Sequence, residues 1–419
     1  MNTQIKMVLN KNHKRLGPSS RYMASLLIAG ACTLLPMSSN AAGNVEGSNM
    51  AMSAVELTQA WPEQVGVDSS KLVQLSEWIR AENLDIRSLL VIKDDKLVFE
   101  RYSSELTRDH NYELYSITKS VTSLLAGMLI AEGKLSLDDS ISSVIGNFRP
   151  DLKDSVADKK EVKLRHLLSM SSGLHYDFNP ENDPIYYGSP DRLKLVSTTT
   201  PKIAPGSEFE YTDVNPVFVA AMVSAAAGMP IEQYAEQKLF KPLGMKNYEW
   251  DRADDQGLVS AGWGLRLRPV DMAKLGLLIK DSGLWNGVRV VPKGWVEQMS
   301  TPVAARDFGY FLWRNHIVDT ELSLDMMGFK GQFISVLPDR NTVVVMTSML
   351  PIDGGLRHGK NVRIFRNIVN DYVIPATQAN PALTMSDATK KVLTRELKIS
   401  GLSVGVPGVF VDPTDTPRK

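Results

Sequence analysis

Ser116 and Lys119 stand one helical turn apart at the head of an apolar run, in the segment Tyr-Ser-Ile-Thr-Lys-Ser at 115–120. Residues i and i+3 of an α-helix share a face, so the lysine amine would lie beside the serine hydroxyl. At the first turn of a helix, unpaired backbone N–H groups and the helix dipole favour an anion. If burial beside other positive charge lowers the lysine pKa, the amine can take or relay the serine proton. This pattern predicts nucleophilic catalysis by Ser116.

The same two residues also have a purely structural interpretation. Ser116 can cap the helix while Lys119 points to solvent. Ser-x-x-Lys occurs once in the chain, and chance alone supplies roughly two such matches at this composition, so the match by itself is weak.

A second polar group precedes another apolar helix, in the segment Tyr211-Thr-Asp213-Val-Asn215. A phenol at Tyr211 could share a proton with Lys119 and pass it to a leaving group. The alternative is a buried tyrosine followed by a helix cap at Asp213.

A third segment, Gly328-Phe-Lys330-Gly331-Gln332, leads into a predicted strand. A glycine at a strand edge lets a substrate approach the backbone closely, although a simple bulge or turn explains the same residues. The loop at 173–190 carries aromatic and histidine side chains that either wall an apolar acyl pocket or pack the loop itself: His175, Tyr176, Phe178, Tyr186 and Tyr187.

Composition excludes several other classes of function. The 419 residues contain 47 Lys plus Arg and 47 Asp plus Glu, scattered without a basic stripe, so we expect no nucleic-acid partner. The six histidines lack metal-binding spacing. Gly-x-Ser-x-Gly, phosphate-loop and dinucleotide motifs are also absent from the sequence. We therefore expect neither a metal nor a cofactor.

The order of elements predicts the fold class. Helical spacing of apolar residues predicts helices at 69–83, 116–132, 161–172, 215–227, 231–239, 270–282, 292–299 and 361–375. Two hairpins are predicted, within Ser88–Tyr102 around Asp94-Asp95, and from Phe333–Leu337 with Thr342–Ser348. Strands near the start must then pair with strands near the end, with the helices between them as a separate layer or lobe. This is an α+β fold with an antiparallel sheet.

The N-terminal residues indicate export. Basic residues precede a short apolar run at 22–35 and a small-residue site ending at Ala41, which is typical of a secretory signal peptide. The run is too short to span a bilayer comfortably, so we expect no stable membrane span; an uncleaved anchor, or lipidation at Cys32, is the alternative. The expected organisation is a signal peptide at 1–41, a lead-in at 42–58, one catalytic domain at 59–376 and an extension at 377–419 without regular structure.

Taken in order, the three motifs resemble those of serine β-lactamases and penicillin-binding proteins, and more closely the related esterases and amidases, including 6-aminohexanoate-dimer hydrolase. Supporting stretches are Leu167–Leu174, Pro242–Met245 and Pro269–Leu277. The resemblance covers roughly residues 60–375 and implies a β-lactamase/transpeptidase-like fold.

The resemblance also implies the roles of individual residues. Ser116 would be the acylated nucleophile, Lys119 and Tyr211 the general-base pair, and the Ser116 N–H with a backbone N–H near Gln332 the oxyanion hole. Lys330 would be a positive group that binds substrate, although a shift of one residue would turn it to the other face of the sheet.

Two departures from the family pattern bear on the substrate. Asp213 stands where class C β-lactamases have Asn, with Asn215 two residues further on, and Phe-Lys-Gly replaces Lys-Thr-Gly or His-Gly-Gly. An added carboxylate would repel the carboxylate of a penicillin. We therefore expect an exported serine hydrolase acting on a small ester or amide. The alternatives are a D-alanyl carboxypeptidase or class C β-lactamase, and a non-catalytic binding protein on the same scaffold.

Overall fold

The computed structural model describes residues 56–103, 106–178, 183–186, 188–250, 253–351, 358–378 and 383–402. All of them belong to one compact unit, Ala51–Lys419. The expected signal peptide at 1–41 lies outside the described residues, as do Tyr187 and most of the expected lead-in.

The main sheet has six antiparallel strands drawn from both ends of the domain. Their spatial order is β2 (Lys96–Tyr102), β1 (Ile86–Lys93), β11 (Thr342–Ser348), β10 (Gln332–Leu337), β9 (Leu324–Gly328) and β8 (Trp313–Arg314). Leu90 of β1 lies opposite Val345 of β11, so early and late strands pair directly. Both predicted hairpins and the α+β class are therefore confirmed.

Tight turns fix the register of the first hairpin. Asp94 and Asp95 both have positive φ angles, 48° and 60°, as a two-residue hairpin turn with right-handed strand twist requires. The amide of Asn341, from the turn of the second hairpin, donates to Asp94 Oδ1 at 2.7 Å. The two turns thereby hold each other in place.

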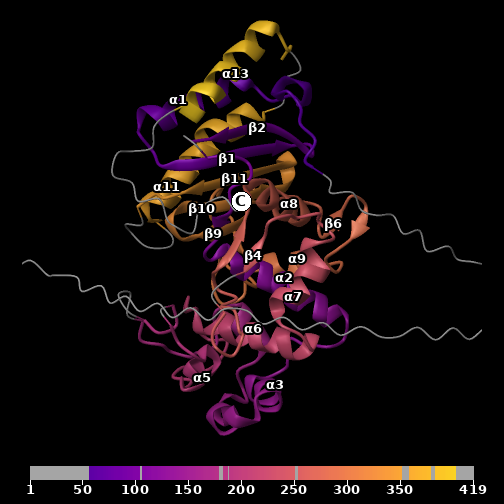
Figure 1. The fold of residues 1–419 in the computed structure, drawn as a ribbon, viewed down its shortest axis with the longest axis vertical. Helices are drawn as coiled ribbons and strands as arrows, with labels where there is room; N and C mark the ends of the chain where they lie inside the picture. Colours follow the sequence, from indigo (N-terminus) through magenta and orange to yellow (C-terminus); the bar gives the residue numbers. More distant parts are fainter. Residues whose placement is uncertain are drawn as a thin grey trace, which may run out of the picture. The chain divides into compact units, whose positions relative to one another are not determined.

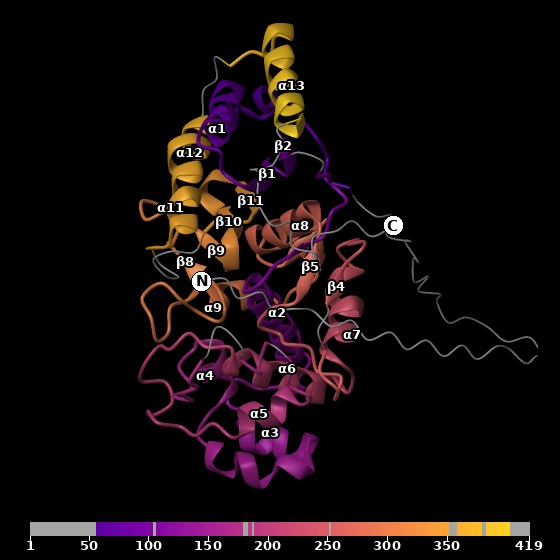
Figure 2. The ribbon, with the colours of Figure 1, turned by 60° about the vertical axis from the view of Figure 1, so that its left-hand side comes forward.

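Helices cover both faces of the sheet, which explains why β1 and β11 are buried along almost their whole length. On one face α8 (Pro269–Lys280) packs on β10 and β11. On the other, α11 (Lys360–Asn367) packs through Phe365, whose ring stacks on Phe333 of β10 at 4.3 Å. Figure 2 shows the sheet between α8 on one side and α1 (Ser69–Ala81), α11 and α12 (Ile374–Ala376) on the other.

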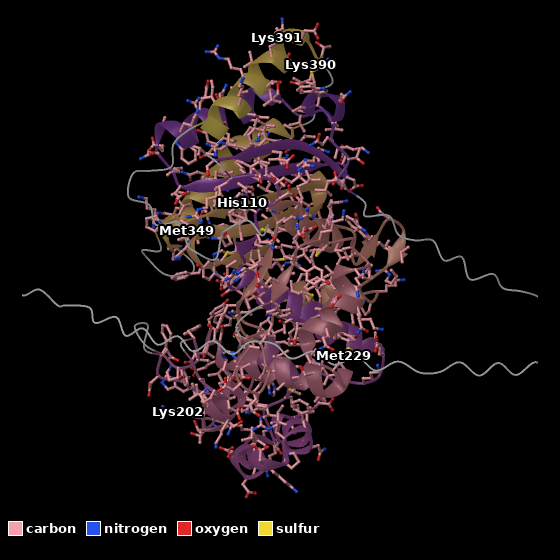
Figure 3. The ribbon with its side chains drawn as sticks, in the orientation of Figure 1. His110, Lys202, Met229, Met349, Lys390 and Lys391 are labelled. Carbon is pink, nitrogen blue, oxygen red and sulfur yellow. The ribbon has the colours of Figure 1, made fainter. Side chains whose placement is uncertain are left out.

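The C-terminal extension contains a helix that the sequence analysis did not predict. Helix α13 (Asp387–Leu402) packs on α1 and β2, and Figure 3 labels Lys390 and Lys391 on it. Its Glu396 pairs with Arg80 of α1 at 2.8 Å, and Ser400 Oγ lies 2.7 Å from Ser76 Oγ. The weak apolar periodicity of this helix is explained by these polar contacts, which replace apolar packing at part of its interface.

The helical part of the domain lies beyond α2 (Ile117–Ala131). This helix contacts β9 and β10 on one side and α6 (Val214–Ala227) on the other, and in Figure 1 it lies between the sheet and α6. The remaining helices here are α3 (Ile141–Phe148), α4 (Leu164–Leu168), α5 (Arg192–Ser197), α7 (Ile231–Ala235) with its π-helical continuation Glu236–Phe240, and α9 (Trp295–Ser300). The predictions missed α3 and α5.

Short elements complete the described chain. They are the strands β3 (Tyr112–Glu113), β4 (Glu249–Trp250), β5 (Leu265–Leu267), β6 (Leu284–Trp285) and β7 (Val288–Arg289), the 3-10 turns Pro62–Val65, Pro150–Leu152, Asp154–Lys159, Phe329–Gly331 and Pro338–Arg340, and the π-helix Ile368–Val373. Within the described ranges, no single helix is long and apolar enough to cross a membrane; α6 together with Ile231–Phe240 passes that test on length and composition as a pair bent by 68°.

Candidate active site

Ser116 lies at the junction of a short strand and the long buried helix. The backbone before it is tied to β5 by the Leu114 N–H, which donates to Leu265 O at 2.9 Å. Tyr115 then takes a left-handed conformation with φ of 47°, unusual for a residue with a side chain, and α2 begins directly afterwards. The turn at Tyr115 places Ser116 at the N-cap of α2, but its side chain makes no capping hydrogen bond. The helix-cap interpretation therefore does not describe this serine.

The side chain of Ser116 instead faces Lys119. Nζ of Lys119 lies 2.9 Å from Ser116 Oγ, and the lysine side chain is only 2% exposed. A solvated lysine on the outer face of the helix is thus excluded. The structure brings the predicted nucleophile and its amine partner together in a buried contact.

Lys119 is also held by two groups from other parts of the chain. Its Nζ lies 2.9 Å from Gly262 O and 2.6 Å from Asp213 Oδ1. Burial lowers the pKa of Lys119, but the carboxylate of Asp213, followed by Tyr211, outweighs burial and raises the pKa above its ordinary value. The expectation of a depressed lysine pKa was therefore wrong, because the nearest charge is negative rather than positive.

Asp213 is the N-cap residue of α6, and like Ser116 it makes no side-chain capping bond. One of its oxygens pairs with Lys119 and the other, Oδ2, accepts a hydrogen bond from the Tyr186 hydroxyl. Because this charge is already paired, the predicted repulsion of a penicillin carboxylate by Asp213 loses most of its physical basis.

Tyr211 lies beside Lys119, with the ammonium 5.0 Å from the ring centroid and hydrogen-bonded to the tyrosine side chain. The tyrosine ring stacks on Trp313 at 6.1 Å, and the edge of Phe308 meets it at the same separation. These aromatic neighbours fix the ring, so the phenol is positioned by packing rather than by the loop alone.

The segment Gly328–Gln332 forms a turn between β9 and β10 instead of a strand edge. Lys330 has a φ of 59° within this turn and is not part of a strand. A shift of strand register by one residue therefore cannot turn its side chain to the other face of the sheet. Its Nζ lies 5.9 Å from the ring centroid of Tyr115, the residue next to Ser116. Phe329 packs on the same ring at 5.4 Å and is itself 45% exposed. A cation and an exposed aromatic ring therefore stand beside the nucleophile.

The side chain of Gln332 is committed to the sheet. Its amide nitrogen donates to Ser348 O at 2.7 Å, and its Oε1 accepts from the Ser348 N–H at 3.3 Å. Gly331 has a φ of 93° and leaves no room for a side chain, because a Cβ would collide with Ser348 Oγ. Only the backbone of these two residues remains as a candidate for oxyanion binding.

Two predicted residues are not brought to Ser116. Asn215 is fully buried, and its amide lies 3.2 Å from the sulfur of Met170. The Tyr176 hydroxyl donates to Asp183 Oδ1 at 2.8 Å within the loop. Three further residues contact the site: Tyr186, Gly262 and Tyr115. The sequence analysis named Tyr186 only as possible pocket lining and did not place Gly262 or Tyr115 in the site.

A cavity of about 390 Å³ lies elsewhere, at the C-terminal end of α6. Its lining includes Gly228, the C-cap of α6, and Met229, which Figure 3 labels. A helix of this length places the two ends roughly 20 Å apart, so the cavity is distinct from the site at Asp213. Among the described residues, no group of three His, Cys, Asp or Glu is placed to hold a metal ion.

The close approach of Gly262 to Asp213 leads to a prediction. A Cβ at this position would lie 2.5 Å from Asp213 Oδ1 and 2.9 Å from Pro216 Cγ. If Ser116 and Lys119 are catalytic, Gly262→Ala should displace the carboxylate from Lys119 and lower kcat/KM at least about tenfold, since misplacement of about 1 Å at a catalytic group costs that much or more. Gly146→Ala in α3 is the matched control, because its Cβ would meet nothing closer than 3.6 Å. Equal activity of both variants would contradict the tight packing described here.

Comparison with known proteins agrees with this geometry. The family model described as Beta-lactamase matches residues 87–365. The chain belongs to the Beta-lactamase family. Its β-lactamase-type domain thus carries the Ser116–Lys119 contact inside the matched region.

Individual proteins that are similar to this chain have names consistent with that family. A "putative D-alanyl-D-alanine carboxypeptidase" of Salmonella agona (strain SL483) is 30% identical over 221 residues, which are 46% of this chain and 50% of that protein. The chain thus spans about half the length of the curated relatives it matches. Among solved structures, a putative β-lactamase from Bacteroides dorei DSM 17855 superposes with a TM-score of 0.61 at 18% identity, covering 74% of this chain and 99% of that one. A putative 6-aminohexanoate-dimer hydrolase from Bacillus anthracis gives 0.59 at 16%, covering 72% and 81%. The β-lactamase/transpeptidase-like fold is therefore confirmed.

Proposed function

We propose that this protein is a serine hydrolase that cleaves a small ester or amide through an acyl-enzyme on Ser116. The observation that carries the proposal is the 2.9 Å contact between Ser116 Oγ and the buried Nζ of Lys119. Covalent hydrolysis needs a nucleophile and a base within hydrogen-bonding distance, with the base oriented by further groups. A protein that only binds a ligand does not need a buried lysine amine beside a serine hydroxyl that makes no capping hydrogen bond.

The steps follow from the positions of the groups. Ser116 Oγ attacks the carbonyl carbon of the substrate while its proton passes to the amine form of Lys119. Tyr211, which also lies beside that amine, shares the proton and delivers it to the departing alcohol or amine. The backbone N–H groups of Ser116 and of the Gly331–Gln332 segment stabilise the negative oxygen. Water then attacks the ester on Ser116, and the same groups run the proton transfers in reverse.

The groups beside Ser116 favour a substrate with an apolar part. Lys119 is already paired with Asp213, and Lys330 is the cation that lies over the neighbouring Tyr115 ring. The exposed ring of Phe329 beside it suits an apolar acyl or alcohol group. The name of the curated relatives supports a second candidate, a D-alanyl carboxypeptidase, in which Lys330 would receive the carboxylate of the substrate.

The experiment is a comparison of three substrates with the purified protein. The proposal predicts clear hydrolysis of p-nitrophenyl butyrate, with little turnover of nitrocefin or of a peptide ending in D-alanyl-D-alanine. Release of D-alanine as the dominant activity would select the carboxypeptidase, and dominant nitrocefin turnover would select a β-lactamase. Failure of a fluorophosphonate probe to label the protein would support a binding protein.

Tyr211→Phe should lower kcat on p-nitrophenyl butyrate about ten- to a hundredfold, because it removes the proton-sharing hydroxyl and keeps the stacked ring. The melting temperature should stay close to wild type, since the contacts with Trp313 and Phe308 are made by the ring. Unchanged kcat would remove Tyr211 from the mechanism.

We also propose that the protein is exported, with cleavage of the signal peptide after Ala41. The support is the basic, apolar and small-residue order of the first 41 residues. N-terminal sequencing of the protein recovered from the periplasm would test this, and a retained Met1 would contradict it.

A further inference from the structure

Asp213 has a different relation to the site from the one the sequence analysis expected. Both of its oxygens are occupied within the protein, Oδ1 by Lys119 at 2.6 Å and Oδ2 by the hydroxyl of Tyr186. The carboxylate is 15% exposed, and it reaches Lys119 from the start of α6 across to α2. The carboxylate is therefore placed to interact with Lys119 and not with a substrate.

The contacts of Lys119 show what that action is. Lys119 donates a hydrogen bond to Gly262 O and forms an ion pair with the Asp213 carboxylate, neither of which can donate to it. Nζ also faces Ser116 Oγ at 2.9 Å, and the Tyr211 side chain is a further hydrogen-bonding partner. An ammonium donates an N–H to Ser116 Oγ and cannot accept a proton. An amine can turn its lone pair to the serine hydroxyl.

We propose that Asp213 is a positioning residue that sets the pH at which Ser116 becomes reactive, by orienting Lys119 and holding it as an ammonium until the pH is high enough to release its proton. The inference rests on the proposed role of Ser116 as nucleophile. The ammonium first loses one proton to solvent. The resulting amine then accepts the Ser116 proton as Oγ bonds to the carbonyl carbon, and that proton later leaves on the alcohol or amine product.

The groups around Lys119 support a dominant effect of Asp213. Ser116 lies on the same helix, Tyr211 and Asp213 precede α6, and Gly262 contributes a neutral carbonyl. Of these, Asp213 acts most strongly to raise the pKa of Lys119, and Tyr211 acts in the same direction. Burial opposes both, so removing the carboxylate leaves only Tyr211 against burial and should lower the pKa.

Tyr186 gives the carboxylate a fixed position. Its ring lies 5.6 Å from that of Trp263, the neighbour of Gly262, and Phe178 meets its other edge at 5.3 Å. Arg192 lies 5.2 Å from the Trp263 ring. The loop that carries Tyr186 and the segment that supplies the Gly262 carbonyl are thus packed together around the same ion pair.

The test is the pH dependence of the labelling rate by a fluorophosphonate probe, measured from about pH 6 to about pH 10 on the full-length protein. The wild-type rate should rise late, with its midpoint near the alkaline end of this range. In Asp213→Asn the midpoint of the rise should move down by about one pH unit or more, a shift that corresponds to about a tenfold change in the amine fraction. Asp213→Glu keeps the charge and should keep the wild-type midpoint even where its rate is lower.

Controls separate this inference from the proposed function. Labelling of Ser116→Ala at the wild-type rate would refute the nucleophile itself. Loss of labelling in Ser116→Ala, together with one shared midpoint for wild type and Asp213→Asn, would refute only the role of Asp213. If Asp213→Asn fails to fold, Tyr186→Phe replaces it: removal of the hydroxyl loosens Asp213, so the midpoint should move down by a smaller amount. An unchanged midpoint in that variant would overturn the inference.

Discussion

Ser116→Ala should abolish covalent labelling by a fluorophosphonate and lower p-nitrophenyl butyrate hydrolysis at least about a thousandfold, as removal of a serine nucleophile does in other hydrolases. The physical reason is that Oγ is the only atom of this residue that faces the Lys119 amine, at 2.9 Å. Because Ser116 makes no side-chain capping bond, the substitution should cost only the hydrogen bond with Lys119, about 1 kcal/mol of stability. Initial rates, probe labelling and thermal unfolding of the same preparation measure all three.

Ser120→Ala is the matched control for that experiment. Ser120 is a buried serine on the same helix, but its hydroxyl donates to Phe311 O at 2.6 Å and has no part in the contact with Lys119. We expect Ser120→Ala to keep full labelling and to lose about 1 kcal/mol of stability from the broken hydrogen bond. Equal loss of labelling in both variants would mean that α2 was disturbed and that Ser116 had not been tested.

Lys119→Met should lower kcat/KM at least about a hundredfold, because it removes the group that takes the serine proton. It should also destabilise the protein by about 3–5 kcal/mol, because the largely buried carboxylate of Asp213 loses its partner at 2.6 Å. Kinetics with p-nitrophenyl butyrate and denaturant unfolding measure the two effects separately.

The double variant Lys119→Met/Asp213→Asn distinguishes catalysis from stability. Removing both charges should restore most of the lost free energy of unfolding, since no unpaired charge remains buried. The activity should stay as low as in Lys119→Met. Recovery of activity along with stability would show that Lys119 supports the fold and takes no proton.

The fold was predictable because its main elements carry local signals. The strands β1 and β11 are rich in β-branched and aliphatic residues, and the turn at Asp94-Asp95 marks the hairpin between β1 and β2. Helix α2 is rich in apolar residues and lacks a charged face, which is typical of a buried helix. By contrast, α13 is amphipathic only in part and docks through charged and hydroxyl groups such as Glu396 and Ser400, so its sequence resembles that of an exposed segment.

Only those contacts of the site that follow from the spacing of residues along one helix could be predicted from the sequence. Ser116 and Lys119 meet because a helix brings i and i+3 together, and this needs no knowledge of the rest of the chain. Gly262 and Tyr186 come from distant loops, and a lone glycine or tyrosine in a loop carries no local signal of such a role. The charge on Lys119 was misjudged for the same reason. The sign of a pKa shift depends on which distant side chain packs beside the amine, and that side chain is Asp213.

The proposed mechanism requires a covalent bond to Ser116, which can be observed directly. The protein would be mixed with p-nitrophenyl butyrate, quenched in acid within the first turnovers, digested and analysed by mass spectrometry. We predict a butyryl group on the peptide that contains Ser116, at the serine itself, and none in Ser116→Ala. A butyryl group on another residue, or rapid turnover by the wild type without any acylated peptide, would contradict the proposed mechanism.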